Sequence, residues 1–308
     1  MNGLLLLSLQ KVGFAVREYR EFTMNRILVA TDFSGGSYGA LNYAKQLAKT
    51  FNAKIFLLHV VDQGTTSIAM QSASRLSDKL DIAETELQRI ASSLSHEGLL
   101  CTTLARSGEI RDVVLNAVHE REIDLLVVGT YGKSGRSDGK LGSIAELLLR
   151  TLPCPVLTVG AGARSNAYKS TYRHSVLFPM DFSEISHSAL PYAECLAAHL
   201  DGSLLLLHIE ERAEGGRGTE ALSALAGEIT NSKVKRECLV RSGNPSDAIV
   251  GLAIERHVDF IVMGVHSPDQ ADKIHNYGTA FEVISKSKCP VFTLFSGQQI
   301  GSQAPAAA

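Results

Sequence analysis

A glycine-rich loop follows the apolar run at residues 125–128 and precedes a helical pattern at residues 144–150. Its glycines let backbone N–H groups approach an anion closely, and Ser143 stands where the first amides of the following helix attract negative charge. The loop therefore predicts a site for nucleotide phosphates. A flexible surface loop between a strand and a helix explains the glycines alone equally well. The glycines are Gly129, Gly132, Gly135, Gly139 and Gly142.

The familiar phosphate-binding motifs do not fit this loop. Val127 stands where a Walker A loop requires its first glycine, and no Gly-x-Gly-x-x-Gly occurs in the chain. The spacing is more specific than the glycine content: two residues separate Gly129 from Gly132, and nine residues then precede the pair Gly142-Ser143. This spacing is similar to the ATP-binding signature of the universal stress protein family.

Three further segments extend the resemblance to that family. Residues 27–34 (Ile-Leu-Val-Ala-Thr-Asp-Phe-Ser) resemble its opening strand, residues 58–61 (Leu-His-Val-Val) its second strand, and residues 153–159 its closing strand. With the second copy described below, the resemblance covers about residues 25–295. It leaves out only the two ends of the chain.

The resemblance implies ATP as the ligand, with Mg²⁺ accompanying it. In ATP-binding members, the aspartate of the opening strand and the valine after the histidine contact adenine and ribose, while the glycines and the serine hold the phosphates. Positive charge in the loop adds candidate partners for the β- and γ-phosphates. The predicted nucleotide-site residues are Ala30, Thr31, Asp32, Val60, Val128, Gly129, Gly132, Lys133, Arg136, Gly142, Ser143 and Ile144.

Asp32 and the histidines at the strand ends have structural roles as alternatives to ligand binding or catalysis. Asp32 can cap the helix that follows it, a role that is compatible with ligand binding, and Ser34 is also a natural helix cap. His59 and its repeat counterpart His208 stand at predicted strand ends. We interpret both histidines as structural residues rather than catalysts.

An internal repeat organises the chain. Asp32 and His59 recur as Asp181 and His208 at an offset of 149 residues, whereas Cys154 recurs at an offset of 135. The second copy is therefore 14 residues shorter. The loss falls between His208 and Gly243, which predicts a helix that is shortened or partly missing there.

Alternating apolar runs and amphipathic stretches predict two doubly wound α/β domains of Rossmann-like, adenine nucleotide alpha hydrolase-like fold. Each is expected to hold a five-stranded parallel sheet with helices on both faces. The predicted strands of the first domain are 26–31, 54–60, 99–105, 124–129 and 155–159, and its helices are 35–51, 72–96, 110–121 and 142–151. Those of the second domain are strands 174–179, 203–208, 236–241, 259–264 and 290–295. The predicted divisions are a disordered extension at 1–23, domains at 24–160 and 173–296, a linker at 161–172 and a disordered tail at 297–308.

The second copy departs from the family pattern in its loop. Ser267 replaces the second glycine, ten residues rather than nine then precede Gly278-Thr279, and Asp269 and Asp272 would repel phosphate. We therefore predict that only the first domain binds ATP well. The last strands of the two domains are expected to pair within one chain, with a homodimer as a further alternative.

Composition excludes several functions. A formal net charge of −2 gives no electrostatic footprint for nucleic acid or an anionic membrane. The apolar run near the N-terminus is too short to span a membrane and lacks the basic flank of a signal peptide, so the cytoplasm is the expected location. The five scattered cysteines form no metal or redox motif and are expected to be reduced.

The leading hypothesis is an ATP-binding protein of the stress response whose nucleotide alters its conformation or partners. No catalytic residues are predicted, because no paired carboxylates or nucleophile arrangement stands out. A slow ATPase or self-phosphorylating enzyme using Ser134, Ser137 or Ser143 is one alternative. A nucleotide-independent interaction scaffold is another.

Overall fold

The structure is a computed structural model, and it describes residues 23–62, 72–132, 141–160, 162–163, 174–210, 217–228, 233–265 and 276–295. Lys133, Arg136, nearly all of the predicted N-terminal extension and linker, and the whole C-terminal tail lie outside these residues. The domain boundaries remain predictions.

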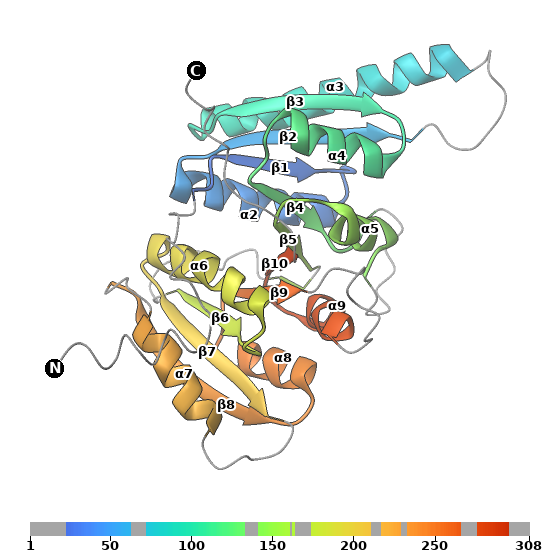
Figure 1. The fold of residues 1–308 in the computed structure, drawn as a ribbon. Coiled ribbons are helices and arrows are strands. Elements are labelled where there is room, and N and C mark those ends of the chain that lie inside the picture. Colours follow the sequence, from blue (N-terminus) through green and yellow to red (C-terminus); the bar gives the residue numbers. More distant parts are fainter. Residues whose placement is uncertain are drawn as a thin grey trace, which may run out of the picture.

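The chain is an α/β protein built on one ten-stranded sheet (Figure 1). The order of strands is β3-β2-β1-β4-β5-β10-β9-β6-β7-β8, so each half repeats the same doubly wound arrangement, and all pairs within a half are parallel. The strands are β1 (Arg26–Ala30), β2 (Lys54–Val61), β3 (Cys101–Ser107), β4 (Leu125–Gly129), β5 (Val156–Val159), β6 (Ser175–Pro179), β7 (Ser203–Glu210), β8 (Lys235–Ser242), β9 (Phe260–Val265) and β10 (Val291–Phe295).

The helices connect parallel strands and lie on both faces of the sheet. They are α2 (Gly35–Phe51), α3 (Ser72–His96), α4 (Ile110–Glu120), α5 (Ser143–Thr151), α6 (Glu184–His199), α7 (Arg217–Glu228), α8 (Pro245–Glu255) and α9 (Asn276–Lys286). The predicted fold class is confirmed. The loss of residues in the second copy also falls where predicted, because α7 has 12 residues and its counterpart α3 has 25.

Two hydrophobic cores flank the sheet, because successive residues of a strand point to opposite faces. Ile27 and Val29 of β1 pack with buried residues of α2, α3, α6 and α7. Leu28 packs on the other face, with those of α4, α5, α8 and α9. Each core contains residues of both domains, so the domains share their apolar interior.

The two halves of the sheet meet through β5 and β10, the only antiparallel pair among the described strands. The Thr158 hydroxyl donates to the Val291 carbonyl at 3.1 Å, and the Thr293 hydroxyl donates to the Val156 carbonyl at 3.1 Å. These reciprocal bonds bury two threonines at the join. Each half thereby covers an edge strand of the other half.

Helices also pack across this join. The Tyr43 ring of α2 meets the Phe260 ring of β9 edge-on at 6.0 Å, and Phe51 stacks on His199 of α6 at 4.3 Å. On the opposite face, the Arg150 guanidinium of α5 lies 5.1 Å from the ring of Phe281 on α9. The domains are thus held together on both faces of the sheet.

Candidate functional site

The turn after β1 places Asp32 at the carboxyl edge of the sheet. Phe33 has a φ of 62°, a left-handed conformation that reverses the chain toward α2. The Ser34 hydroxyl caps α2 by accepting from the Ser37 amide at 3.3 Å, which confirms Ser34 as the helix cap. Asp32 is not the cap; its Oδ1 accepts from the Ser34 amide at 3.0 Å and braces the turn.

The end of β2 also contacts the turn after β1. His59 donates from Nδ1 to the Thr31 carbonyl at 2.7 Å, and its ring stacks on Phe33 at 4.4 Å. Both contacts give this histidine a structural role in the turn. Val60, the next residue, is half-buried at the edge and follows directly in β2. This arrangement fixes the position of Asp32 relative to β2.

Two glycines lie where backbones come into contact. A Cβ on Gly129, at the end of β4, would lie 2.9 Å from the carbonyl carbon and oxygen of Gly36 in the first turn of α2. A Cβ on Gly142 would lie 2.9 Å from the Thr130 carbonyl oxygen. The glycine spacing therefore has a structural function of its own: it lets α2, β4 and the start of α5 approach one another.

Gly132 brings the glycine loop against Asp32. A Cβ at this position would lie 2.7 Å from Asp32 Oδ2, so the second carboxylate oxygen faces the backbone of Gly132. The clash would be with the end of a flexible side chain rather than with backbone. Asp32 and Gly132, 100 residues apart in sequence, are thus neighbours at the switch point between β1 and β4.

The start of α5 is open to solvent at the same edge. Gly142 is its N-cap, with a φ of −64°, and its amide already donates to the Thr130 carbonyl at 2.9 Å. The next two residues, Ser143 and Ile144, are exposed, and Ile144 is 44% exposed. First-turn amides of a helix have no partner within the helix, so this end is suited to an anion.

The predicted site residues therefore fall into three groups. Asp32, Gly132 and the start of α5 line the carboxyl edge, whereas Val128 is 6% exposed and could reach a ligand only through its backbone. Ala30 ends β1, and the Thr31 hydroxyl bonds the Ser37 hydroxyl at 3.0 Å within the turn. Lys133 and Arg136 are the predicted residues outside the described part of the chain.

Sequence reasoning missed two residues that shape this site. Thr130 is 1% exposed; its amide donates to the Val159 carbonyl at 3.0 Å, and its own carbonyl receives the Gly142 amide, which draws both ends of the loop together. Gly36 is the second, because a Cβ there would strike the Tyr131 carbonyl oxygen. The sequence feature that could have indicated this contact is the pair of glycines at 35 and 36, directly after the helix cap Ser34.

The second domain repeats the turn and the close approach of helix to strand. The Asp181 carboxylate accepts from the Ser183 amide at 3.0 Å, and a Cβ on Gly264 would lie 2.6 Å from the Ile185 carbonyl oxygen. In this domain α9 begins at Asn276, two residues before Gly278. The loop residues Ser267, Asp269 and Asp272 lie outside the described chain.

A difference appears at the end of β7, where Glu210 stands in the place of Val61. Its Oε1 accepts from the Gly218 amide at 3.2 Å, at the start of α7. A Cβ on Gly218 would lie 2.6 Å from Glu210 Oε1 and 2.7 Å from His208 Cδ2. The shortened helix is therefore packed closely against the end of β7.

Other chemistry has little support among the described residues. Within them, no group of three or more His, Cys, Asp or Glu side chains is arranged to hold a metal ion. Burial raises the pKa of the Cys101 thiol to about 11 and that of Cys154 to about 12, so neither is a ready nucleophile at neutral pH. In the described part of the chain, no helix combines the length and apolar character needed to cross a membrane.

The fold and the edge geometry define a tandem pair of Rossmann-like α/β domains. The model of the universal stress protein family matches residues 23–160 and 173–294, and the chain therefore belongs to that family. Each match spans one copy of the repeat.

Known proteins agree with this assignment. Universal stress protein YxiE of Bacillus subtilis is 31% identical over 150 residues, covering 44% of this chain and 98% of that protein. A universal stress protein of Methanocaldococcus jannaschii is 28% identical over 137 residues, covering 44% of this chain and 81% of its own. The crystal structure of a universal stress protein from Archaeoglobus fulgidus covers 90% of this chain and all of its own, with a TM-score of 0.74 and 23% identity. The similarity to this crystal structure shows that the fold is shared across both domains of the chain.

Proposed function

We propose that the first domain binds ATP at the carboxyl edge of its strands, and that the nucleotide controls the conformation or partners of the protein in a stress response. The observation that carries the proposal is the contact between Asp32 and Gly132 beside the exposed start of α5. A carboxylate for sugar hydroxyls and a helix start for phosphates meet there at a topological switch point.

The residues present fit a nucleoside triphosphate. Asp32 Oδ2 would accept from the ribose hydroxyls, the backbone at Val60 would read the adenine edge, and the first amides of α5 at Ser143 and Ile144 would hold phosphate oxygens. The glycines keep side chains out of this edge. Lys133 and Arg136 are proposed to pair with the β- and γ-phosphates, which would also carry the accompanying Mg²⁺.

The test is to purify the protein without added nucleotide, denature it, and identify any released small molecule by chromatography and mass. Gly132→Ala is the informative variant, because its new Cβ would displace the Asp32 carboxylate without striking backbone. Ser267→Ala changes the corresponding loop of the second domain and is the matched control. We expect ATP at one per chain in the wild type and in Ser267→Ala, and none in Gly132→Ala.

A protein purified empty is tested by adding ATP. Saturation at about 100 times the dissociation constant should stabilise the fold by about 2.7 kcal/mol, measured by thermal unfolding. A wild type that is empty and also ignores added ATP would contradict the proposal and favour the interaction scaffold. Release of ADP instead of ATP would favour slow turnover, and its loss in Gly132→Ala would locate that turnover in the first domain.

We also propose that the two domains stand in for a dimer of single-domain chains. The antiparallel register of β5 and β10 supports this, because it leaves neither strand available to a second chain. Sedimentation should then give a monomer of 33.1 kDa, and a homodimer would show that another surface pairs. The five cysteines all lie among the described residues and form no disulfide, which supports a reducing compartment, and we propose the cytoplasm.

A further inference from the structure

A groove of about 490 Å³ lies between α2 and α3, on the face of the sheet opposite α5. Its volume falls within the range of about 300–1,000 Å³ that is typical of small-molecule sites. It is separate from the candidate phosphate position, which lies at the start of α5. The lining residues are Phe33, Tyr38, Asp81, Ile82, Thr85 and Glu86.

Two apolar side chains form part of the groove wall. Ile82 is 69% exposed on α3, one of the most exposed large apolar side chains among the described residues. Phe33, from the turn after β1, lines the same groove, and one face of its ring is stacked on His59 at a centroid distance of 4.4 Å. A ligand that covered Ile82 and the remaining surface of Phe33 would remove both from water.

The two carboxylates of the groove differ in their partners. Glu86 accepts from the Tyr38 hydroxyl at 2.8 Å and from the Arg89 guanidinium at 2.6 Å. These hydrogen bonds lower the pKa of Glu86 to about 2, and the bond from Arg89 has the larger effect. The negative charge of Glu86 is thus paired with Arg89. Among the described residues, no ion pair reaches the carboxylate of Asp81, an exposed residue that lines the groove. The negative charge open to a ligand is therefore that of Asp81.

We propose that this groove binds a small amphipathic organic cation, with its apolar part against Phe33 and Ile82 and its ammonium group at Asp81. The size of the groove favours a small molecule over a protein, because six residues line it, whereas a stable protein interface takes about 20–30 residues from each partner. The acidic rim favours an amine over an anion of the same shape.

The test compares three indoles that differ only in the end group of the side chain: tryptamine, tryptophol and indole-3-acetate. Each is titrated into the full-length protein while amide signals of α2 and α3 are followed by NMR. We expect tryptamine to bind most tightly, tryptophol about threefold more weakly, as for an exposed ion pair, and indole-3-acetate not measurably.

Variants separate the two parts of the groove. Asp81→Asn should make tryptamine and tryptophol equal, whereas Ile82→Ser should weaken both. The matched controls are Asp78→Asn, another exposed carboxylate of α3, and Leu100→Ser, where an isoleucine-sized side chain is 71% exposed outside the groove. Neither control should change the affinities.

Three results would overturn the proposal: no saturable binding of tryptamine by the wild type, a preference for the amine that survives Asp81→Asn, or shifts confined to residues outside α2 and α3. Because the probes carry no phosphate, ATP binding can be measured on the same variants. A variant that loses tryptamine binding but still binds ATP would show that its defect lies in the groove and not in the nucleotide site. If Gly132→Ala loses ATP binding but still binds tryptamine, its defect lies in the nucleotide site and not in the groove.

Discussion

The two domains keep the same turn at the end of their first strand and differ in what surrounds it. Phe33 and Phe182 have left-handed φ values of 62° and 59°, and each packs against the histidine of the following strand, His59 or His208. Both histidines bond a backbone carbonyl of the turn, at 2.7 and 2.8 Å. The repeat has thus retained the residues that build the carboxyl edge, whether or not a nucleotide binds there.

The covering helices show what has changed. In the first domain α3 has 25 residues, and a groove separates it from α2. In the second domain α7 has 12 residues, and Gly218 packs directly on Glu210 and His208. One fold can thus change the length and packing of a covering helix while its strands and turns stay the same.

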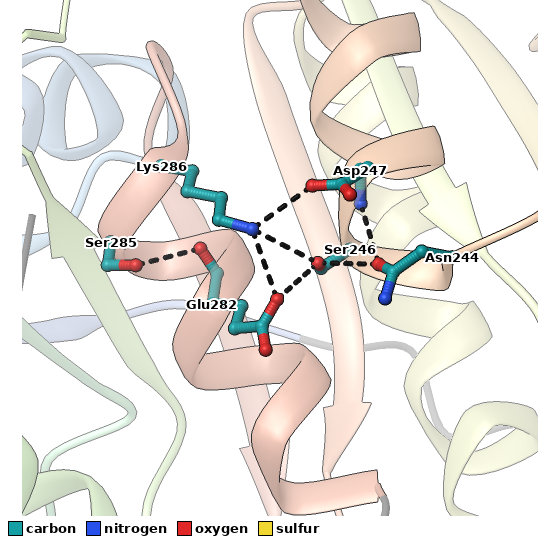
Figure 2. A network of polar contacts seen from close by, with 6 residues as sticks. All are labelled: Asn244, Ser246, Asp247, Glu282, Ser285 and Lys286. Atoms are coloured by element: carbon teal, nitrogen blue, oxygen red, sulfur yellow. Dashed lines mark hydrogen bonds and ion pairs between the residues drawn. The ribbon is translucent and has the colours of Figure 1, made fainter.

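The helix after the fourth strand also differs between the domains. Figure 2 shows the polar contacts that hold α9 to the start of α8: Ser246 bonds Glu282, and Lys286 Nζ lies 3.0 Å from Asp247 and 3.1 Å from Glu282. The positions that correspond to Ser246, Glu282 and Lys286 in the first domain hold Arg111, Leu147 and Thr151. These cannot form the same network, so α5 lacks this tie to α4.

The largest effect is expected where a glycine joins helix to strand. In Gly264→Ala, the new Cβ would lie 2.6 Å from the Ile185 carbonyl oxygen, whereas in Gly129→Ala it would lie 2.9 Å from Gly36. Overpacking against backbone costs about 1–3 kcal/mol. We expect a loss near the top of that range in the second domain and a smaller loss in the first, measured by urea unfolding.

The controls are glycines with open space around the missing side chain. Among the described residues, and apart from the adjacent residues and backbone of the same helix, no atom lies within 4 Å of a Cβ on Gly39 in α2 or Gly251 in α8. Alanine there should therefore stabilise its helix by up to about 1 kcal/mol. Equal losses for Gly129→Ala and Gly264→Ala would show that the two domains pack their first helix equally closely. The expected difference in helix packing between the two domains would then be wrong at this contact.

Much of the fold could be predicted from local sequence patterns. The apolar spacing of α2 and α3 predicted their observed ends, because it depends on residues near one another in the chain. The shortened α7 could be located by comparing the two copies of the repeat residue by residue. The contacts of Gly129 and Gly142 could not be predicted from spacing, because the same glycines serve either a ligand or a backbone contact. Long-range pairs such as Ser246 and Glu282 leave no periodic signal.

An intermediate effect is expected for Ser246→Ala. Ser246 is 2% exposed, and its hydroxyl lies within hydrogen-bond distance of the acceptors Asn244 Oδ1 and Glu282 Oε2, so the variant removes the polar centre of the α8–α9 network. Loss of a buried hydrogen bond costs about 1 kcal/mol. Hydrogen exchange should accelerate in α9. Arg111→Ala, at the corresponding exposed position of the first domain, should leave exchange in α5 unchanged; faster exchange there would show that α5 has an equivalent tie.

The smallest effect is expected from Glu86→Gln in the first domain. Hydrogen bonds from Arg89 and Tyr38 lower the pKa of Glu86 from 4.5 to about 2 in the folded protein. The contribution of this carboxylate to stability is therefore complete above about pH 4.5 and is lost as the pH falls toward 2. Solvent around the pair limits it to a few tenths of a kcal/mol.

The second domain differs at this place, because His187 occupies the position of Tyr38 and α7 is shorter. Thermal unfolding should therefore show Glu86→Gln below the wild type at pH 6, with the difference closing between about pH 4.5 and 2. Asp78→Asn, also on α3, controls for removal of a carboxylate. A gap that stayed constant down to pH 2 would mean that Glu86 acts through packing rather than charge, and α2 and α3 would then be joined by contacts that acid does not break.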